Sequence, residues 1–347
     1  MSADYKKGYR VEGLGFRKST DAEVDTLYPK PYTLTMRVQE MAAEQLKLSE
    51  RLRGVIKGTI LTEEPLSLHT YLRIGGPAEV MIYPAGLEDL KALLKVARDE
   101  AIPLLILGGG SNVLVLDGGV RGLVINLSRT FLELEASGEQ IRCGASVRTS
   151  RLLAFSAMSS LTGLEGLTGV PGTVGGAIKG NAGTPLGAIV DHLDWIRLVD
   201  GLGEERHLMR EELGPGYRYC TLPAGSAIVE ACFTLRRGRA AEIRGTISTL
   251  LARRNLTQPV EVRSAGCFFK NPPGDFAGRL VEQVGLKGLR RGGAQISEKH
   301  GNFIVNLGGA TAADVFWLIE RVRADVMVKT GVELELEIQV VGSPIAG

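Results

Sequence analysis

The chain has 347 residues, of which 44% are hydrophobic and 23% are charged. A chain of this size buries a large core and is expected to divide into about two or three domains. The formal net charge of +2 at pH 7 argues against nucleic acid as the main partner. No apolar stretch reaches the length of a membrane span, and the first residues lack the apolar segment of a signal peptide. We therefore expect no membrane insertion and a cytoplasmic location.

The first half of the chain contains a polar segment, a helix and a compact unit of strands and a helix. Residues 1–36 are polar and irregular, and a helical period of apolar residues follows over 38–55 until Gly58 ends it. From Val80 the pattern predicts a short strand, then a helix, then a second strand that runs into Gly108. One face of the predicted helix carries Leu90, Leu93, Leu94 and Ala97.

The second half predicts hairpins, helices and a terminal strand. Residues 132–147 and 193–208 are typical of hairpins, and residues 151–161 of a helix between them. Helices are expected over 240–256 and 277–284 and after Thr311, which is a good N-cap residue. Strands are expected around Cys267 and over 303–306. Residues 332–340 alternate strictly between apolar and polar residues, which predicts a half-buried strand.

Residues 163–183 form the least ordinary segment of the chain, with eight glycines in twenty-one residues. Glycine this dense marks backbone that takes unusual dihedral angles or lies directly against a large ligand, so we expect a buried loop that contacts a ligand. Smaller clusters occur at residues 73–78 and 107–113. Bare amides suit a diphosphate, whose oxygens accept several backbone hydrogen bonds. The alternative for each cluster alone is a set of tight turns in a β-rich domain.

Neither common nucleotide-binding fingerprint fits these clusters. Val113 stands where the dinucleotide fingerprint needs its third glycine, and a strand rather than a helix is predicted to follow. In the segment 172–179, Ile178 stands where a P-loop needs the glycine before its lysine, and Gly180 replaces the Ser or Thr that holds magnesium. Both a Rossmann and a P-loop interpretation therefore fail.

The four cysteines, at positions 143, 220, 232 and 267, are scattered without a close pair. This spacing favours neither disulfides nor a zinc site, and we expect no metal. Three polar features remain as candidates for chemistry: residues 216–219, residues 263–272, and Glu337. Each has an ordinary alternative. Tyr217 and Arg218 could be a surface pair, Cys267 a buried small residue beside two phenylalanines, and Glu337 one more residue on a solvated strand face.

Six motifs in order resemble the UDP-N-acetylenolpyruvoylglucosamine reductase (MurB) family, in its shorter subtype. They are the segments 71–78, 107–115, 163–183, 216–219, 265–272 and 334–338, and the resemblance covers about residues 38–342. It implies an α+β protein with an FAD-binding fold of the vanillyl-alcohol-oxidase type and a C-terminal α+β substrate domain. The implied organisation is an accessory segment at 1–36, a first flavin-binding subdomain at 37–128 completed by a strand at 332–342, a second at 129–237, and a substrate-binding domain at 238–331.

The reaction that the resemblance implies is the reduction of UDP-N-acetylenolpyruvoylglucosamine to UDP-N-acetylmuramate in peptidoglycan synthesis. FAD is the implied cofactor and NADPH the co-substrate, the partner is a small UDP-sugar, and no obligate protein partner is implied. By motif position, Arg218 and Glu337 match the residues that stabilise the enolic intermediate, and Cys267 matches the proton donor. Reduction of an enol ether conjugated to a carboxylate needs these functions, because negative charge develops on the α carbon and carboxylate before a proton arrives.

Cys267 departs from the commoner serine of the family. The unperturbed pKa of a thiol is about 8.5, far below that of an aliphatic alcohol, so we expect the proton to be given up more easily than from serine. Activity should decline as pH rises through the pKa of this thiol, and the thiol should be sensitive to alkylation and oxidation. The pH range of the thiol stays open at this point.

The resemblance also implies binding residues. The substrate positions are Tyr217, Lys270 and Asn271. The flavin positions are Arg73, Ile74, Gly75, Gly76, Gly108, Gly109, Gly110, Ser111, Asn112, Gly169, Pro171, Gly172, Gly175, Gly176, Ile178, Asn181 and Gly183.

Two other functions stay open at this point. One is another FAD-dependent oxidoreductase on the same fold, because a fold alone does not fix the reaction. The other is a flavin-binding module without catalysis. His300 lies in a loop of the C-terminal region, where a surface role is expected.

Overall fold

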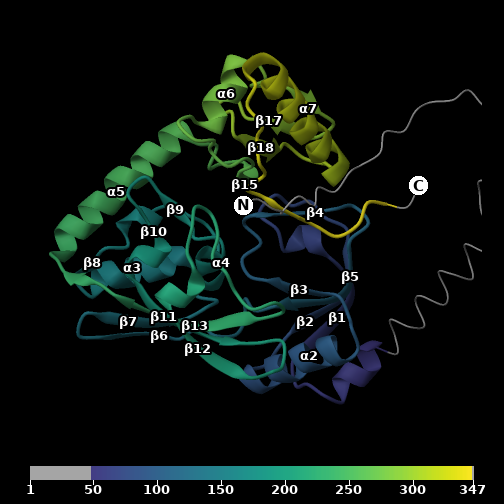
Figure 1. Cartoon of the computed structure of the whole chain (residues 1–347), viewed down its shortest axis with the longest axis vertical. Coiled ribbons are helices and arrows are strands. Elements are labelled where there is room, and N and C mark those ends of the chain that lie inside the picture. Colours follow the sequence, from purple (N-terminus) through teal and green to yellow (C-terminus); the bar gives the residue numbers. More distant parts are fainter. Residues whose placement is uncertain (1–47, 346–347) are drawn as a thin grey trace, which may run out of the picture. The chain divides into compact units, whose positions relative to one another are not determined.

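The structure, a computed structural model, describes residues 48–345. The segment 1–36 and most of the predicted helix at 38–55 lie outside these residues, although residues 48–53 are helical as expected. The described residues contain three larger sheets with helices packed on them (Figure 1).

The first sheet has the strand order β1-β2-β5-β3, in which β1 is antiparallel to β2 while β2 and β3 are parallel to β5. Its strands are β1 (Thr59–Pro65), β2 (Pro77–Tyr83), β3 (Leu104–Leu107) and β5 (Val120–Asn126). Helix α2 (Leu87–Asp99) buries the predicted face of Leu90, Leu93, Leu94 and Ala97 against it. The predicted strand, helix and strand before Gly108 are confirmed.

The second sheet is antiparallel, in the order β12-β11-β13-β7-β6. Its strands are β6 (Leu134–Ser137), β7 (Gln140–Gly144), β11 (Leu193–Val199), β12 (Glu205–Met209) and β13 (Ala227–Thr234). Both predicted hairpins are confirmed, and α3 (Thr149–Met158) is the predicted helix between them. Short pairs join β8 (Leu161–Thr162) to β14 (Arg236–Arg237), and β9 (Gly183–Thr184) to β10 (Gly187–Ala188).

The glycine-rich segment is more regular than a loop. It contains the 3-10 turn η3 (Glu165–Leu167) and the helix α4 (Val174–Lys179). Val174, Ala177 and Ile178 of α4 are buried in the core of this region, which outweighs the low helix propensity of the glycines between them. Further 3-10 turns are η2 (Leu66–Leu68), η4 (Ile189–His192) and η5 (Arg210–Leu213).

The C-terminal sheet has the order β15-β18-β17-β16 and is antiparallel. Its strands are β15 (Arg263–Cys267), β16 (Arg290–Arg291), β17 (Ala294–Ile296) and β18 (Phe303–Asn306). The helices α5 (Ala240–Thr257), α6 (Ala277–Gln283) and α7 (Ala312–Thr330) confirm the predicted ones, and the side chain of Thr311 caps α7 by accepting from the Asp314 N–H at 3.1 Å.

The predicted terminal strand over 332–340 is only partly right. Regular pairing is confined to β19 (Gln339–Val341), which runs parallel to β4 (Val113–Val115). The preceding residues bond instead to the segment after β15, through Lys270 N–H to Glu335 O and Glu337 N–H to Phe268 O, each at 2.9 Å. The segment therefore changes partner along its length. Leu334 and Ile338 are buried while Glu333 and Glu335 are exposed, so the alternation of burial remains.

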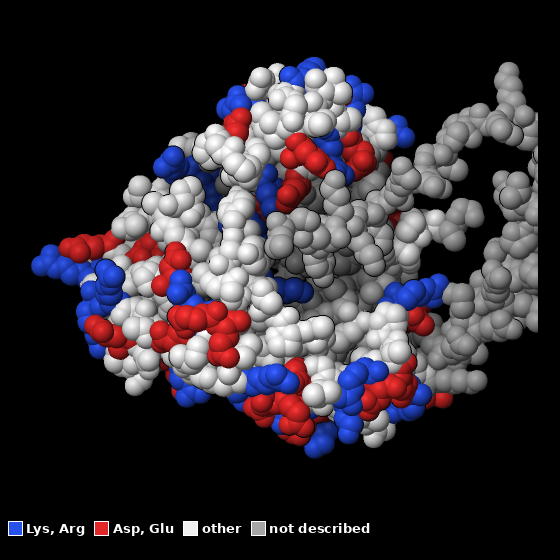
Figure 2. All heavy atoms as spheres, in the orientation of Figure 1, with Lys and Arg blue, Asp and Glu red and all other residues white. Residues whose placement is uncertain are grey.

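Buried residues form separate clusters around these sheets, and the domain boundaries proposed from the sequence remain a prediction. No helix of the described residues is long and apolar enough to cross a membrane. Figure 2 shows Lys, Arg, Asp and Glu side chains interspersed over the visible face, with a hollow near its centre.

Candidate active site

Arg218 and Glu337 come from distant segments and form an ion pair, with Arg218 Nε 2.9 Å from Glu337 Oε1. Arg218 sits in the turn between Gly216 and Tyr219, where its φ of 65° is in the left-handed region that few non-glycine residues adopt. Its Nη1 donates to Gly183 O at 3.0 Å, next to the glycine-rich segment. The strained turn directs the guanidinium toward Glu337 and that segment.

Glu337 is not on a solvated face. Its side chain is only 18% exposed, and its backbone O accepts from the Asn112 side chain at 3.0 Å. Burial raises the pKa of Glu337, although the positive charges of Arg218 and Lys270 oppose the rise. This carboxyl therefore holds a proton more readily than an exposed one, beside the glycine loop at 108–112.

Cys267 ends β15 and is partly buried. Burial raises the pKa of its thiol to about 12; the charge of Glu337 adds to the rise, and Arg218 and Arg254 act against it. Arg218, Cys267 and Glu337 are therefore close enough for their charges to interact. The pKa of this thiol therefore lies well above that of an unperturbed thiol, because the side chain is enclosed. All four cysteines are free.

The predicted substrate residues lie beside this cluster. Asn271 N–H donates to Tyr217 Oη at 3.3 Å, which joins the turn at 216–219 to the segment after β15. Lys270 Nζ lies 3.2 Å from the exposed carboxylate of Glu335. The Asn271 side chain accepts from Ala277 N–H at the start of α6, so it also has a structural role.

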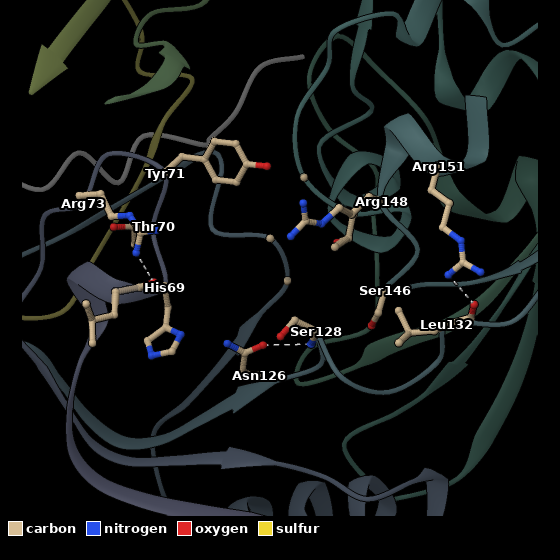
Figure 3. A pocket seen from close by; sticks show the side chains of 15 residues that line it. His69, Thr70, Tyr71, Arg73, Asn126, Ser128, Leu132, Ser146, Arg148 and Arg151 are labelled. Atoms are coloured by element: carbon tan, nitrogen blue, oxygen red, sulfur yellow. Dashed lines mark hydrogen bonds between the residues drawn. The ribbon is translucent and has the colours of Figure 1, made fainter. Parts of the chain in front are cut away.

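A cavity of about 650 Å³ lies between the first and second sheets (Figure 3). This volume is in the range of sites for small molecules and cofactors, roughly 300–1,000 Å³. Of the predicted flavin residues, Arg73, Gly108, Gly109 and Gly172 line it. A smaller cavity, of about 70 Å³, adjoins at Gly108 and is also lined by Gly175 and Gly176.

The remaining predicted flavin residues do not line these two cavities, and their contacts are with other parts of the protein. Ser111 Oγ donates to Pro171 O at 3.3 Å, which ties two of the glycine clusters together. Ile74 and Ile178 are buried in hydrophobic clusters, so only their backbone is available to a ligand. Five further glycines contact other parts of the protein: Gly75 and Gly76 against residues 115–119, Gly110 against His69 O, Gly169 against the Arg254 side chain, and Gly183, whose carbonyl accepts from Arg218.

Asn181 contacts the turn at residues 216–219, which carries Arg218. Its Nδ2 donates to Gly216 O at 2.8 Å, while its buried Oδ1 has no partner among the described residues. Together with Asn112, it links the glycine segments to the turn that carries Arg218 and to Glu337.

Sequence reasoning missed several residues that line the large cavity, Arg148 above all. Arg73 donates to Leu68 O, and Arg151 donates to Leu132 O at 3.4 Å, whereas the Arg148 guanidinium has no partner among the described residues. Figure 3 shows Arg148 and Tyr71 pointing into the space between them. Arg148 precedes α3 and carries no motif, so only its position in space marks it. The other missed lining residues are Leu68, His69, Thr70, Asn126, Ser128, Leu132, Ser146 and Thr173.

The residues of the cavity fit FAD. A Cβ on Gly109 would lie 2.8 Å from Gly172 Cα, and one on Gly108 would lie 2.7 Å from Thr173 Oγ1, so the two loops meet where side chains are missing. Their bare backbone and the unpaired Arg148 together offer N–H groups and positive charge to a diphosphate.

His300 is not a surface residue. Its ring packs on Phe303, with 4.8 Å between ring centroids, and lies 3.1 Å from the place of a Cβ on Gly278. Burial lowers the pKa of His300. We therefore assign His300 a role in packing.

Comparison with known proteins agrees with this geometry. Residues 78–209 match the family described as FAD binding domain, and residues 258–341 match UDP-N-acetylenolpyruvoylglucosamine reductase, C-terminal domain. UDP-N-acetylenolpyruvoylglucosamine reductase 2 of Symbiobacterium thermophilum is 44% identical over 298 residues, which cover 85% of this chain and 97% of that protein. The chain belongs to the UDP-N-acetylenolpyruvoylglucosamine reductase family.

Other members of the family support the assignment. The reductase of Moorella thermoacetica is 45% identical over 295 residues, which cover 85% of this chain and 97% of that protein. The crystal structure of the reductase from Thermus caldophilus is 39% identical, covers 83% of this chain and 100% of that one, and superposes with a TM-score of 0.72. The expected α+β architecture with an FAD-binding fold of the vanillyl-alcohol-oxidase type is confirmed.

Proposed function

We propose that this chain catalyses the FAD-mediated, NADPH-dependent reduction of UDP-N-acetylenolpyruvoylglucosamine to UDP-N-acetylmuramate, in the cytoplasm, as a step of peptidoglycan synthesis. The main support for the proposal is the position of three residues. Arg218, Cys267 and Glu337, which are far apart in the sequence, lie in one electrostatically coupled cluster beside the glycine segments. Family membership supports the same reaction.

The glycine loops at residues 107–113 and 163–183, together with Arg148, bind FAD. Bound FAD supplies the hydride that NADPH provides. Gly108, Gly109 and Gly172 present backbone without side chains to the cavity, and Arg148 supplies a cation that no described residue neutralises. These residues hold the diphosphate and fix the position of the flavin.

Arg218 and Glu337 stabilise charge on the substrate. When hydride reaches the β carbon of the enolpyruvyl group, negative charge develops on the α carbon and the carboxylate. The guanidinium of Arg218 opposes that charge. Glu337, whose pKa is raised by burial, donates a hydrogen bond to the same oxygens when it is protonated.

Cys267 completes the reaction by donating its proton to the α carbon. The S–H bond breaks, the new C–H bond forms, and the thiolate that remains regains a proton from water. A raised pKa keeps the thiol protonated at neutral pH, so the donor is always loaded. Arg218 and Arg254 then stabilise the thiolate electrostatically.

The substrate is held over this cluster by residues on either side. Tyr217, Lys270 and Asn271 border the cluster, and Lys270 supplies a cation for a phosphate or a carboxylate. We propose residues 238–331 as the substrate-binding domain and residues 37–128 and 129–237 as the flavin-binding subdomains, with the strand at 332–342 completing the first.

Steady-state kinetics test the proposed function. Purified protein should oxidise NADPH in the presence of UDP-N-acetylenolpyruvoylglucosamine but not UDP-N-acetylglucosamine, and the product should have the mass of UDP-N-acetylmuramate. Both co-substrates must present a carbon to the same flavin, so initial-rate lines at several fixed NADPH concentrations should be parallel. Absence of the product would refute the function, and it would leave the module without catalysis or another oxidoreductase as the alternatives.

A further inference from the structure

The turn at residues 216–219 holds Arg218 in an unusual backbone conformation. Its φ of 65° is costly for a residue with a side chain and persists only where the surrounding structure enforces it. Gly216 N–H donates to Tyr219 O at 3.0 Å, and Tyr219 N–H donates to Gly216 O at 3.3 Å. Residues 216 and 219 therefore form the base of the turn, and Arg218 lies between them.

The end of helix α4 and the residues after it hold this turn from outside. Asn181 Nδ2 donates to Gly216 O at 2.8 Å, and Cys220 N–H donates to Lys179 O at 3.0 Å. Both bonds end at or beside the base of the turn. They place the turn next to the glycine-rich segment, but they do not by themselves fix the backbone of Arg218.

The aromatic ring of Tyr219 packs on Gly216. A Cβ on Gly216 would overlap this ring and would lie 2.5 Å from Tyr219 Oη. Gly216 does not have a left-handed φ, so its own backbone conformation does not require glycine. The missing side chain therefore makes room for the ring. Tyr219 is 53% exposed, so the ring covers the base of the turn without belonging to the hydrophobic core.

We infer that Tyr219 is a positioning residue for Arg218, because its ring, packed on Gly216, keeps the turn closed and directs the guanidinium toward Glu337. The inference rests on the proposed function, in which Arg218 stabilises charge on the substrate. Gly216 and Tyr219 are the two residues of this turn to which that function gives no role. Arg218 Nε lies 2.9 Å from Glu337 Oε1. A displacement of about 1 Å in such a group lowers a rate by about 100-fold.

Two other roles for Tyr219 make different predictions. If the ring contacted the substrate directly, its loss would weaken binding of the nucleotide. If the ring contributed only to stability, its loss would lower the unfolding temperature of the holoenzyme and leave both half-reactions unchanged. A positioning role predicts a slower second half-reaction with little change in binding.

The test is stopped-flow measurement of both half-reactions in FAD-loaded variants, together with the dissociation constant of the oxidised enzyme for UDP-N-acetylenolpyruvoylglucosamine. Tyr219→Ala should slow reoxidation of the reduced flavin by this nucleotide about 10- to 100-fold. Flavin reduction by NADPH and the dissociation constant should change far less, because Arg218 acts mainly after hydride transfer. Tyr219→Phe keeps the ring and should restore most of the rate.

Gly216→Ala tests the contact from its other side. The added carbon should displace the flexible end of the Tyr219 side chain, so this variant should show the same kinetic loss as Tyr219→Ala. Two matched controls should keep the rates of the wild type. They are Gly245→Ala, on α5 with nothing within 4 Å of the added carbon, and Phe316→Ala, an exposed aromatic residue on α7.

A double variant decides whether Tyr219 acts through Arg218. Tyr219→Ala should then cause no further slowing in Arg218→Met. The inference is overturned if Tyr219→Ala is reoxidised as fast as the wild type, if it weakens binding by the factor by which it slows the reaction, or if its effect adds fully to that of Arg218→Met. A wild type that the nucleotide does not reoxidise would refute the proposed function itself and, with it, this inference.

Discussion

Arg218 and Glu337 act, in this account, on charge that exists mainly after hydride transfer. Arg218→Met and Glu337→Gln should therefore each lower kcat by about 10²- to 10³-fold while changing substrate affinity far less. Reduction of the flavin by NADPH should survive in both variants. Stopped-flow measurement of the two half-reactions checks this, and a variant that lost only affinity would remove its residue from charge stabilisation.

Cys267 is the residue at which the chain differs from the commoner family serine. Cys267→Ala should leave FAD binding and the reaction with NADPH intact and stall the second half-reaction, whereas Cys267→Ser should retain much of the activity. Because the thiol pKa is raised to about 12, the proton is lost only as pH rises toward that value. The thiol should therefore impose no limb on the rate between about pH 7 and 10, and iodoacetamide should react with it slowly. A thiol-dependent limb near pH 8.5 would contradict the structure.

The motifs of the site could be recognised in the sequence, but the sequence did not show that their residues lie close together. The three catalytic candidates could be named from motif position, yet each alone had an ordinary explanation. Their coupling depends on the change of partner along residues 332–341, which places Glu337 beside Phe268 and Asn112. Arg148 and Arg254 belong to no motif. Neither guanidinium has an acidic partner among the described residues, and Arg148 lines the large cavity while Arg254 donates only to Thr168 O, at 3.4 Å. Such pairings arise from tertiary contacts that local patterns do not encode.

At the scale of elements, the glycine loops are the parts that we propose to bind FAD. Gly109→Val should release FAD, because its side chain would meet the Gly172 backbone. Gly175→Val should do the same, since a Cβ at 175 is already 3.0 Å from the Ala145 Cβ. The ratio of flavin to protein absorbance after gel filtration measures the loss. Gly245→Val is a matched control, on the exposed side of α5 with nothing within 4 Å of the added carbon. Full FAD retention in both valine variants would contradict the proposed loops.

Helix α7 is bound at its start by Asp117, a residue between β4 and β5. Asp117 accepts from Ala312 N–H at 2.8 Å and from Ala313 N–H at 2.9 Å, beside the cap that Thr311 provides. Asp117→Ala should lower the free energy of unfolding by about 1 kcal/mol, the usual contribution of a helix cap. Denaturant unfolding of the holoenzyme measures it. An unchanged midpoint would show that Thr311 alone is sufficient.

Most elements could be predicted because their signals are local. The apolar face of α2 and the cap of α7 are patterns of a few residues, and both are confirmed. The errors fall where tertiary contacts override local preference. Helix α4 forms within a glycine-rich segment because Val174 and Ile178 are buried, and residues 332–338 lose regular strand pairing because they bond to the segment after β15.

At the scale of the whole molecule, we assign two half-reactions to one flavin site. Its glycine loops and its catalytic residues come from the regions of all three sheets. Anaerobic spectroscopy of the flavin with sequential additions tests this most directly. Purified protein should be yellow, one equivalent of NADPH should bleach the flavin band, and one equivalent of UDP-N-acetylenolpyruvoylglucosamine should then restore it with formation of UDP-N-acetylmuramate. Failure to bind FAD, or a bleached flavin that the enolpyruvyl nucleotide does not reoxidise, would contradict the account.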